Sequence, residues 1–349
     1  MRVRVLYLYR PRLPELRAQA VQVLHTCHAL ARRGHEVTLL ADRSVGFGGS
    51  ATEALGRYGL DHPLGLDLRL APTAWLPGAG LWFRATVAGW CARSGRDAVV
   101  YARAKRYVTL IPARIPVVVE AHELDSALDV EAGRDAAANA VLERAVYTRA
   151  AGLVANCGGT LRCIREHHPQ IPKAEVIWNA TRADRSVRGV GGGGVGVVGS
   201  SGDYKGVRSV LIAAAAGPSA VTLVGASADI PAVRSLPAVA YGDVPAVLAG
   251  FDVLLLPLLD NLFGRSLTNP LKLWDYLATD RPIVAPDLPA IREVTEDVHF
   301  YDPRQLDTVV PAIARALAQR VRSPRLRTWD DRAEEIERFL CETLRMFTR

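Results

Sequence analysis

The chain has 349 residues, of which 49% are hydrophobic and 23% are charged, so its composition excludes a largely disordered protein. This length suits two domains better than one. The net charge of +7 favours an anionic partner, but a nucleotide, a nucleic acid and an anionic membrane meet that description equally well. Charge alone therefore does not choose among these three partners.

Cysteine usage and the N-terminus bear on location. The five cysteines are scattered and form no C-x-x-C pair, which argues against a zinc site or a disulfide framework and suits a reducing cytoplasm. The apolar run from Met1 to Tyr9 leads into Arg10-Pro11-Arg12, not into a small-residue cleavage site. No apolar run approaches the roughly 20 residues of a membrane helix. We expect a cytoplasmic protein, and peripheral contact with the inner membrane face stays open because basic residues are plentiful.

Short apolar runs alternate with segments of helical period in the first half of the chain. The first unit consists of a strand at Val3–Tyr9, a helix at Arg17–Arg33 that ends at Gly34, and a strand at Glu36–Leu40. Further runs predict strands at 98–101, 116–120, 152–155 and 175–178. This alternation is typical of a parallel sheet covered by helices, so we predict a Rossmann-like domain over 1–187.

A glycine-rich segment at 188–194 contains four successive glycines and predicts a linker. After it, strands at 195–198, 220–224, 253–256 and 282–285 predict a second Rossmann-like domain over 195–324. Within the C-terminal segment 325–349, Trp329–Phe347 carries apolar side chains at helical spacing and predicts a helix that docks by one face. The pattern does not say which domain this helix docks on. The predicted fold class is α/β, with two doubly wound domains.

Residues 194–199 spell G-x-G-x-x-G, but the middle of the pattern is itself the predicted strand, so we reject a dinucleotide fingerprint. The loop after that strand runs from Gly199 through Ser200 and Lys205 into a helix predicted at 207–215. Ligands of open α/β sheets bind outside the carboxyl ends of strands, so Lys205 is placed to meet a phosphate. The alternative is a solvated loop lysine.

The segment 263–281 (FGRSLTNPLKLWDYLATDR) combines a helix start with charged groups. Thr268 or Asn269 can cap this helix, with Pro270 in its first position and open amides near Leu271. Lys272 adds a positive charge for a phosphate, and Asp275 offers a carboxylate for both hydroxyls of a ribose. The alternative is an exposed ion pair between Lys272 and Asp275 worth roughly 0.3 kcal/mol. It explains the arrangement poorly, because a lysine that precedes an aspartate on a helix is the less favourable order. Arg265 either adds a second cation or faces water.

His122 and Glu123 follow the strand predicted at 116–120, at the carboxyl edge of the first sheet. A zinc protease is excluded, because H-E-x-x-H needs a histidine where Ser126 stands. No D-x-D pair is present to hold a divalent metal on a diphosphate. His122 is either a packed histidine or a functional one, and its place at a strand end favours the second.

Several of these segments together resemble glycosyltransferase family 4, whose members have the GT-B fold, retain the anomeric configuration and use nucleotide-sugar donors. The resemblance covers nearly the whole chain, through LARRGHEV at 30–37, VIWNA at 176–180, DVLLLP at 252–257 and PLKLWDYLA at 270–278. It implies that the two domains face each other across a cleft in which the reaction takes place.

The resemblance implies that Asp275 is the last acidic residue of the E-x7-E motif and holds the ribose, that Lys205 holds the diphosphate and that His122 lies near the donor sugar. Two positions depart from the pattern: Leu267 replaces the first glutamate, and Ser200 replaces an arginine. The N-terminal loop also lacks the family's glycine pair and carries charge instead, including Arg17. We therefore expect a more charged acceptor side.

The sequence as a whole predicts a metal-independent retaining glycosyltransferase of bacterial type, with no cofactor, no nucleic-acid partner, and a natural-product or envelope-glycan acceptor. The alternatives are a nucleotide-sugar epimerase and a non-catalytic nucleotide-sugar-binding partner. Three sets of residues are expected to act. The catalytic set is His122, Lys205 and Lys272; the donor-binding set is Gly199, Ser200, Lys205, Arg265, Asn269, Pro270, Leu271, Lys272 and Asp275; the acceptor-side set is Arg17 and Glu123.

Overall fold

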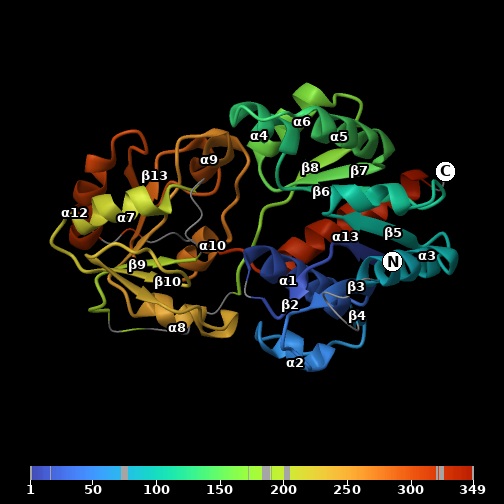
Figure 1. Ribbon diagram of the computed structural model, residues 1–349, viewed down its shortest axis with the longest axis horizontal. Coiled ribbons are helices and arrows are strands. Elements are labelled where there is room, and N and C mark those ends of the chain that lie inside the picture. The colour runs from blue at the N-terminus through green and yellow to red at the C-terminus, as the bar shows by residue number, and fades with distance from the viewer. Residues whose placement is uncertain are drawn as a thin grey trace. The chain divides into compact units, whose positions relative to one another are not determined.

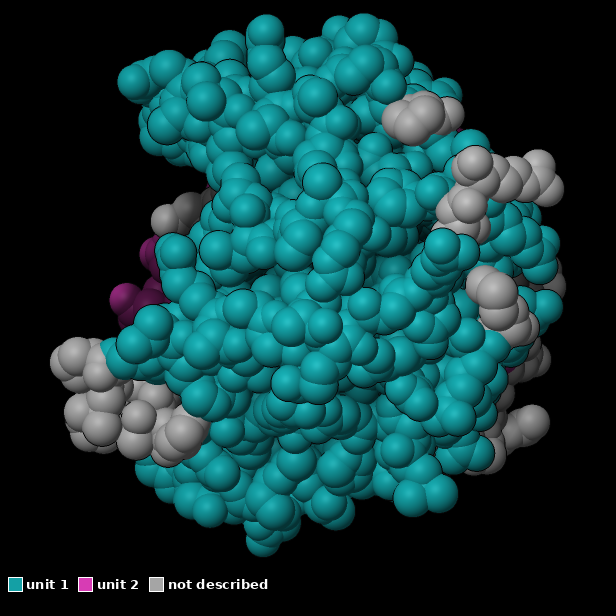
Figure 2. All heavy atoms as spheres, turned by 90° about the vertical axis from the view of Figure 1, so that its right-hand side faces the viewer, with its two compact units in different colours: residues 1–178, 329–349 teal, residues 179–328 magenta. Residues whose placement is uncertain are grey.

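Two parallel β-sheets, each in its own unit of the chain, organise the computed structural model (Figure 1). Unit 1 comprises residues 1–178 and 329–349, and unit 2 comprises residues 179–328 (Figure 2). The structure describes residues 2–15, 17–71, 78–171, 173–182, 189, 191–199, 205–319, 321 and 326–347. The α/β class is confirmed. The predicted linker at 188–194 lies partly outside the described residues, so those domain boundaries stay a prediction.

The sheet of unit 1 runs in the order β2-β3-β1-β5-β6-β7-β8, with β4 also paired to β3. Every strand predicted in this half is present, because buried parallel strands are continuous apolar runs in the sequence. The strands β2 and β4 were not predicted. The strands are β1 (Arg4–Leu8), β2 (Arg12–Leu13), β3 (Glu36–Arg43), β4 (Leu66–Leu70), β5 (Ala98–Ala102), β6 (Val117–Ala121), β7 (Gly152–Ala155) and β8 (Ala174–Val176).

The helices of unit 1 are α1 (Ala18–Arg32), α2 (Ala51–Gly56), α3 (Ala79–Ala92), the short 3-10 helix η1 (Lys105–Leu110), α4 (Asp125–Glu131), α5 (Ala137–Arg149), α6 (Gly158–His167) and α13 (Trp329–Phe347). Most of them lie between the strands of unit 1 in the sequence, whereas α13 follows unit 2.

The last helix, α13, belongs to unit 1, although unit 2 lies between them in the sequence. Its apolar face includes Ile336 and Phe339, both fully buried, and it packs against α1. A Cβ at Gly152 in β7 would lie 2.8 Å from Cε1 of Phe339. Glycine at this position therefore lets the helix approach the sheet, which decides the docking question that the sequence pattern left open.

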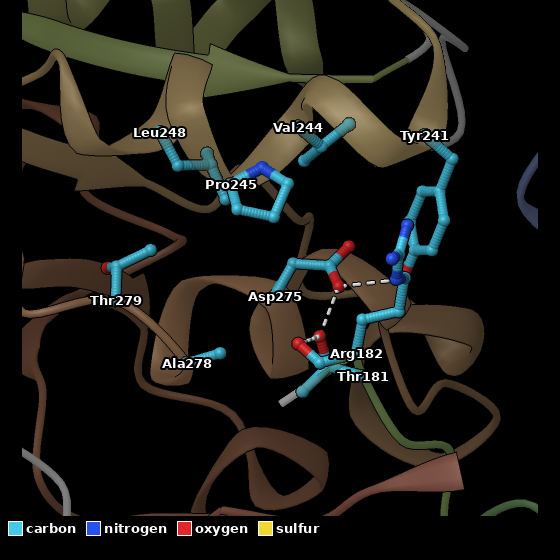
Figure 3. A pocket seen from close by; sticks show the side chains of 9 residues that line it. All are labelled: Thr181, Arg182, Tyr241, Val244, Pro245, Leu248, Asp275, Ala278 and Thr279. Carbon is cyan, nitrogen blue, oxygen red and sulfur yellow. Dashed lines mark hydrogen bonds between the residues drawn. The ribbon is translucent and has the colours of Figure 1, made fainter. Parts of the chain in front are cut away.

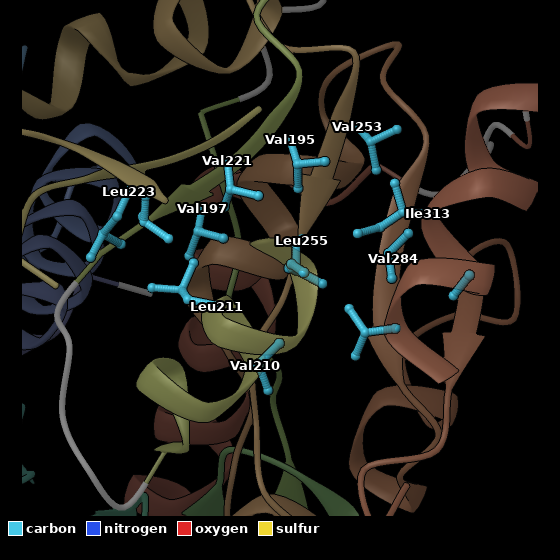
Figure 4. Close-up of a cluster of buried hydrophobic side chains, with 14 of the residues drawn as sticks. Val195, Val197, Val210, Leu211, Val221, Leu223, Val253, Leu255, Val284 and Ile313 are labelled. Atoms are coloured by element: carbon cyan, nitrogen blue, oxygen red, sulfur yellow. The ribbon is translucent and has the colours of Figure 1, made fainter. Parts of the chain in front are cut away.

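The sheet of unit 2 has the order β11-β10-β9-β12-β13-β14. Counted along the chain this is 3-2-1-4-5-6, the order of a dinucleotide-binding sheet, with its switch point between β9 and β12. Valine and leucine side chains from β9, β10 and β12 pack against α7 and α12 (Figure 4). The strands are β9 (Val195–Val198), β10 (Val221–Val224), β11 (Val233–Leu236), β12 (Val253–Leu255), β13 (Ile283–Pro286) and β14 (His299–Tyr301).

The helices of unit 2 are α7 (Val207–Ala215), the 3-10 helix η3 (Tyr241–Asp243), α8 (Val244–Ala249), α9 (Leu262–Ser266), α10 (Leu271–Leu277), α11 (Pro289–Arg292), the 3-10 helix η4 (Leu306–Thr308) and α12 (Val309–Ala318). The predicted cap of α10 is wrong. Pro270 is its N-cap residue, no side chain caps it, and the helix begins at Leu271.

None of the helices in the described part of the chain is long and apolar enough to cross a membrane.

Candidate functional site

The switch point of the unit 2 sheet positions the first group of candidate residues. Gly199 directly follows β9 and has a φ of +125°, a backbone conformation that favours glycine. A Cβ built on Gly199 would lie 3.3 Å from the Nζ of Lys272 and 3.5 Å from its Cε. Two segments that are far apart in sequence, the loop after β9 and the start of α10, therefore meet where ligands of such sheets bind.

The amine of Lys272 is buried and has no hydrogen-bond partner within the described part of the chain. Burial and, to a smaller extent, the positive charge of Lys205 together lower the pKa of Lys272 from 10.5 to about 7. A buried ammonium normally has an ionic or hydrogen-bonding partner, because its desolvation is costly. The positive charges of Lys205 and Lys272 repel each other. An anion bound beside this loop would neutralise both charges, so the pair favours anion binding.

Asp275, one turn after Lys272 on α10, lies in a pocket of unit 2 (Figure 3). Its Oδ1 accepts hydrogen bonds from Thr181 Oγ1 at 2.6 Å and from the Tyr241 hydroxyl at 2.9 Å. Burial raises the pKa of Asp275 to about 6, although both hydroxyl donors act to lower it. The carboxylate is therefore held by neutral donors, and its second oxygen carries no hydrogen bond from the residues drawn in Figure 3.

The start of α10 differs from the predicted anion site. The helix has seven residues, and the amide of Leu273 donates to the carbonyl of Pro270, so the helix dipole contributes less than the lysines. Asn269 is buried, and its Oδ1 accepts from the backbone amide of Asn179 at 2.7 Å and from the indole of Trp274 at 2.9 Å. Asn269 thus anchors the neighbouring segment, and we no longer assign its side-chain oxygen to the ligand.

Arg265 lies in α9, and its Nε forms an ion pair with Asp260 at 2.8 Å. Arg304 contacts the same carboxylate, in a separate pocket at the ends of β13 and β14. The structure therefore does not bring Arg265 into the group around Lys272. Ser200, the other predicted donor-binding position, lies outside the described residues.

His122 follows β6 in unit 1 and lies in a buried charged cluster. Its Nε2 is 3.0 Å from Nη1 of Arg103 and 3.2 Å from Oε1 of Glu120. Burial and the charge of Arg103 lower the pKa of His122 to about 4, although Glu120 acts to raise it. Nε2 thus faces both a donor, the Arg103 guanidinium, and an acceptor, the Glu120 carboxylate, so the contact that it makes depends on the tautomer of the ring.

Glu120 connects this cluster to the last helix. Its Oε1 accepts from Nη2 of Arg332 at 2.5 Å, and both side chains are fully buried. Burial alone would raise the pKa of Glu120, but Arg332 and His122 hold it well below the usual range. Gln22 donates to the same oxygen at 2.7 Å. The carboxylate is ionised and fully engaged, so it is unsuited to take up a proton in a reaction.

The predicted acceptor-side residues lie around Tyr9, just after β1. The guanidinium of Arg103 stands 5.5 Å from the centre of the Tyr9 ring. Burial raises the pKa of the Tyr9 hydroxyl. The charges of Arg103 and Arg17 lower this pKa and the charge of Glu123 raises it, so all three act on Tyr9. Arg17 is largely exposed and pairs with Glu15 at 2.8 Å. The carboxyl edge of this sheet is thus polar and mostly basic, and its role stays a prediction.

Among the described residues, no group of three or more His, Cys, Asp or Glu side chains could hold a metal ion.

Comparisons with known proteins agree with this architecture. Residues 19–185 match the model of Glycosyltransferase Family 4. Sucrose-phosphate synthase from Thermosynechococcus elongatus has a similar structure, with a TM-score of 0.78 and 13% sequence identity over 99% of this chain and 100% of that one. The chain has the GT-B glycosyltransferase fold. The predicted fold is confirmed, and the family match supports the predicted enzyme class.

Two further solved structures share this GT-B fold. Anabaena Alr3699/HepE in complex with UDP and glucose aligns with a TM-score of 0.69 and 14% identity over 98% of this chain and 99% of that one. An α,α-trehalose-phosphate synthase (UDP-forming) from Burkholderia xenovorans, in complex with glucose-6-phosphate, aligns with a TM-score of 0.59 and 11% identity over 100% and 98%. No curated protein matches the sequence.

Sequence reasoning missed several residues of these groups, among them Arg103, Glu120, Arg332, Thr181 and Tyr241. Glu120 and Arg332 each carried a signal, since a charge interrupts an apolar strand in one case and an apolar helical stripe in the other. Thr181 and Tyr241 carried none, because a single threonine and a single tyrosine have no spacing that points to Asp275.

Proposed function

We propose that the protein is a retaining, metal-independent glycosyltransferase that moves a sugar from a nucleoside-diphosphate sugar to a hydroxyl group of its acceptor. The observation that carries this proposal is the buried Lys272 amine, which lies beside the Gly199 backbone and feels the charge of Lys205. In this proposal unit 2 binds the nucleotide. The two lysines bind the diphosphate, and Asp275 accepts from the ribose.

The proposed mechanism needs no nucleophile from the protein. The departing diphosphate accepts the proton of the acceptor hydroxyl, while Lys205 and Lys272 stabilise its growing negative charge. The lysines also supply positive charge of the kind that a divalent metal supplies at other diphosphate sites, which supports metal independence. Retention is supported by the match of residues 19–185 to Glycosyltransferase Family 4.

Unit 1 is proposed to bind the acceptor at the basic carboxyl edge of its sheet, near Tyr9 and His122. The neutral His122 ring, fixed by Arg103, is a hydrogen-bond partner and not a strong base. Acceptors of two kinds, natural products and envelope glycans, remain within the proposal. Among the relatives of this fold, AviGT4 is described as acting in avilamycin A biosynthesis and WaaG in lipopolysaccharide biosynthesis. We place the reaction in the cytoplasm.

Nucleotide binding tests the site first. Titration calorimetry with UDP, GDP and ADP identifies the base, and the tightest ligand is then measured with two variants. Lys205→Ala and Lys272→Met should each weaken nucleotide binding by about 3 kcal/mol, which is on the order of a hundredfold in affinity, and both variants should stay folded. Lys173→Met is the matched control, because this lysine pairs with Glu342 in unit 1. Unchanged affinity in both variants would refute the site.

Incubation with nucleotide sugars separates the alternatives. Without acceptor, a nucleotide-sugar epimerase forms a new sugar nucleotide, whereas a transferase gives only slow hydrolysis. With a panel of acceptors, a transferase gives a product whose anomeric configuration, measured by NMR coupling constants, equals that of the donor. Turnover that persists in excess chelator supports metal independence. Tight nucleotide binding with no product from any acceptor would favour the non-catalytic binding partner.

A further inference from the structure

The carboxylate of Asp275 has an asymmetric set of hydrogen bonds. Thr181 and Tyr241 both donate to Oδ1, at 2.6 and 2.9 Å, and the two dashed lines in Figure 3 end on that one oxygen. A carboxylate oxygen has two acceptor directions, so these hydroxyls fill Oδ1. The other oxygen, Oδ2, receives no hydrogen bond from any residue that the structure describes.

The two donors are themselves held in place. Thr181 is buried, its amide donates to the carbonyl of Arg327 at 3.0 Å, and it pairs with Thr328 in an isolated bridge. Two residues earlier, the Nδ2 of Asn179 donates to the carbonyl of Asn269 at 2.6 Å. Tyr241 is buried at the start of η3, which leads directly into α8. Neither hydroxyl has to be ordered when a ligand arrives.

Hydrogen bonds at only one oxygen leave much of the desolvation free energy of the Asp275 carboxylate without compensation, which a purely structural role does not explain. Val244, Pro245 and Leu248 line the same pocket together with Arg182, and among the described residues Asp275 forms no ion pair. A carboxylate in such surroundings needs hydrogen bonds at both oxygens to offset its desolvation. The vicinal diol of a ribose can donate two hydrogen bonds to a single oxygen, and it would satisfy Oδ2.

We propose that Thr181 and Tyr241 are positioning residues that hold Asp275 by Oδ1, so that Oδ2 alone receives the ribose hydroxyls of the bound nucleotide. This inference rests on the proposed function, because it assigns the ligand of Asp275 to a nucleoside diphosphate. Thr181 and Tyr241 act through the carboxylate and do not touch the ribose. Their effect must therefore depend on the presence of the ribose hydroxyls.

Paired ligands isolate that dependence. The nucleoside diphosphate that binds wild type most tightly and its 2′,3′-dideoxy counterpart are titrated into wild type, Thr181→Val, Tyr241→Phe and the double variant. We expect the double variant to lose about tenfold or more in affinity for the ribonucleotide and less than twofold for the dideoxynucleotide. Thr181→Ser keeps the hydroxyl and should restore the ribonucleotide affinity. Thermal unfolding verifies that each variant is folded.

The control is Tyr301→Phe, which removes another buried hydroxyl of unit 2, one that contacts the backbone of Leu258. It should leave the ratio of the two affinities unchanged. Equal losses for both ligands in the double variant, or no loss for either, would overturn the positioning role. If wild type binds no nucleoside diphosphate at all, the proposed function fails and this inference fails with it. If the double variant unfolds, the single variants Thr181→Val and Tyr241→Phe decide the outcome, each by its own ratio of the two affinities.

Discussion

Replacing Lys272 by methionine should make the free protein more stable and weaken nucleotide binding on the order of a hundredfold. Methionine keeps the aliphatic stem of the lysine and removes a buried amine that has no hydrogen-bond partner in the described structure. A pKa of about 7, against the ordinary 10.5, means that folding with this amine protonated costs about 4 kcal/mol near neutral pH. We expect Lys272→Met to raise the free energy of unfolding by about 2 to 4 kcal/mol at pH 6 to 7, because repacking recovers less than the full cost.

The sign of the pH dependence follows from the direction of this shift. Between pH 7 and 10.5 the unfolded chain binds the Lys272 proton more tightly than the folded protein does, so wild-type stability rises with pH relative to the variant. The stability gain of Lys272→Met should therefore be largest at or below pH 7 and fall by about half by pH 9.

Urea unfolding at pH 6, 7.5 and 9 measures this difference, and calorimetry with the preferred nucleotide measures binding. Lys173→Met is again the control, and its smaller effect should not follow the same pH course. The reasoning is refuted if Lys272→Met is less stable than wild type at pH 6, if its advantage does not shrink at pH 9, or if it still binds the nucleotide at wild-type affinity.

Three further predictions concern both units. Arg332→Leu should lower the free energy of unfolding of unit 1 by about 3 to 5 kcal/mol, because it leaves Glu120 buried without its ionic partner. Arg338→Leu, which breaks a surface pair with Glu175, should lower it by less than about 1 kcal/mol. Urea unfolding compares the two variants, and equal effects would contradict the role of the buried pair. Affinity for a nucleotide sugar should be greatest between about pH 6 and 7, because Asp275 is protonated below this range and Lys272 loses its proton above it; a flat profile from pH 5 to 9 would contradict both assignments. Gly152→Ala should destabilise unit 1 by about 1 to 3 kcal/mol through its contact with Phe339, while Gly80→Ala, with open space around its Cβ, should be nearly neutral in thermal unfolding.

Most strands of both sheets were predictable because they are continuous apolar runs between polar turns, whereas β2, β4, β11 and β14 were not predicted. The predicted bounds of α7 and α13 agree with the structure for the same reason, since their apolar residues recur at helical spacing. The meeting of Gly199 with Lys272 was also within reach of the sequence. Both follow strands of one parallel sheet, whose carboxyl ends share an edge.

The partners of the charged residues were not predictable. Thr181 and Asp275 are 94 positions apart, and Glu120 and Arg332 are 212 apart, so no local pattern connects them. The cap of α10 was predicted at Thr268 or Asn269, the usual residue types for a cap. The side chain of Asn269 instead bonds to Trp274 and Asn179, because a buried amide is stabilised more by these tertiary contacts than by an exposed helix end.

The place of α13 in unit 1 has a consequence for how the protein is made. On the ribosome, residues 179–328 emerge after most of unit 1 and before α13, so unit 2 has all of its own chain while unit 1 still lacks its last helix. Until Arg332 arrives, Glu120 has no cation of the last helix to offset its burial, and the apolar surface that Phe339 covers stays open to water. We therefore expect nascent chains to carry a folded second unit attached to an incomplete first one, whose open apolar surface is accessible to chaperones until α13 has been made.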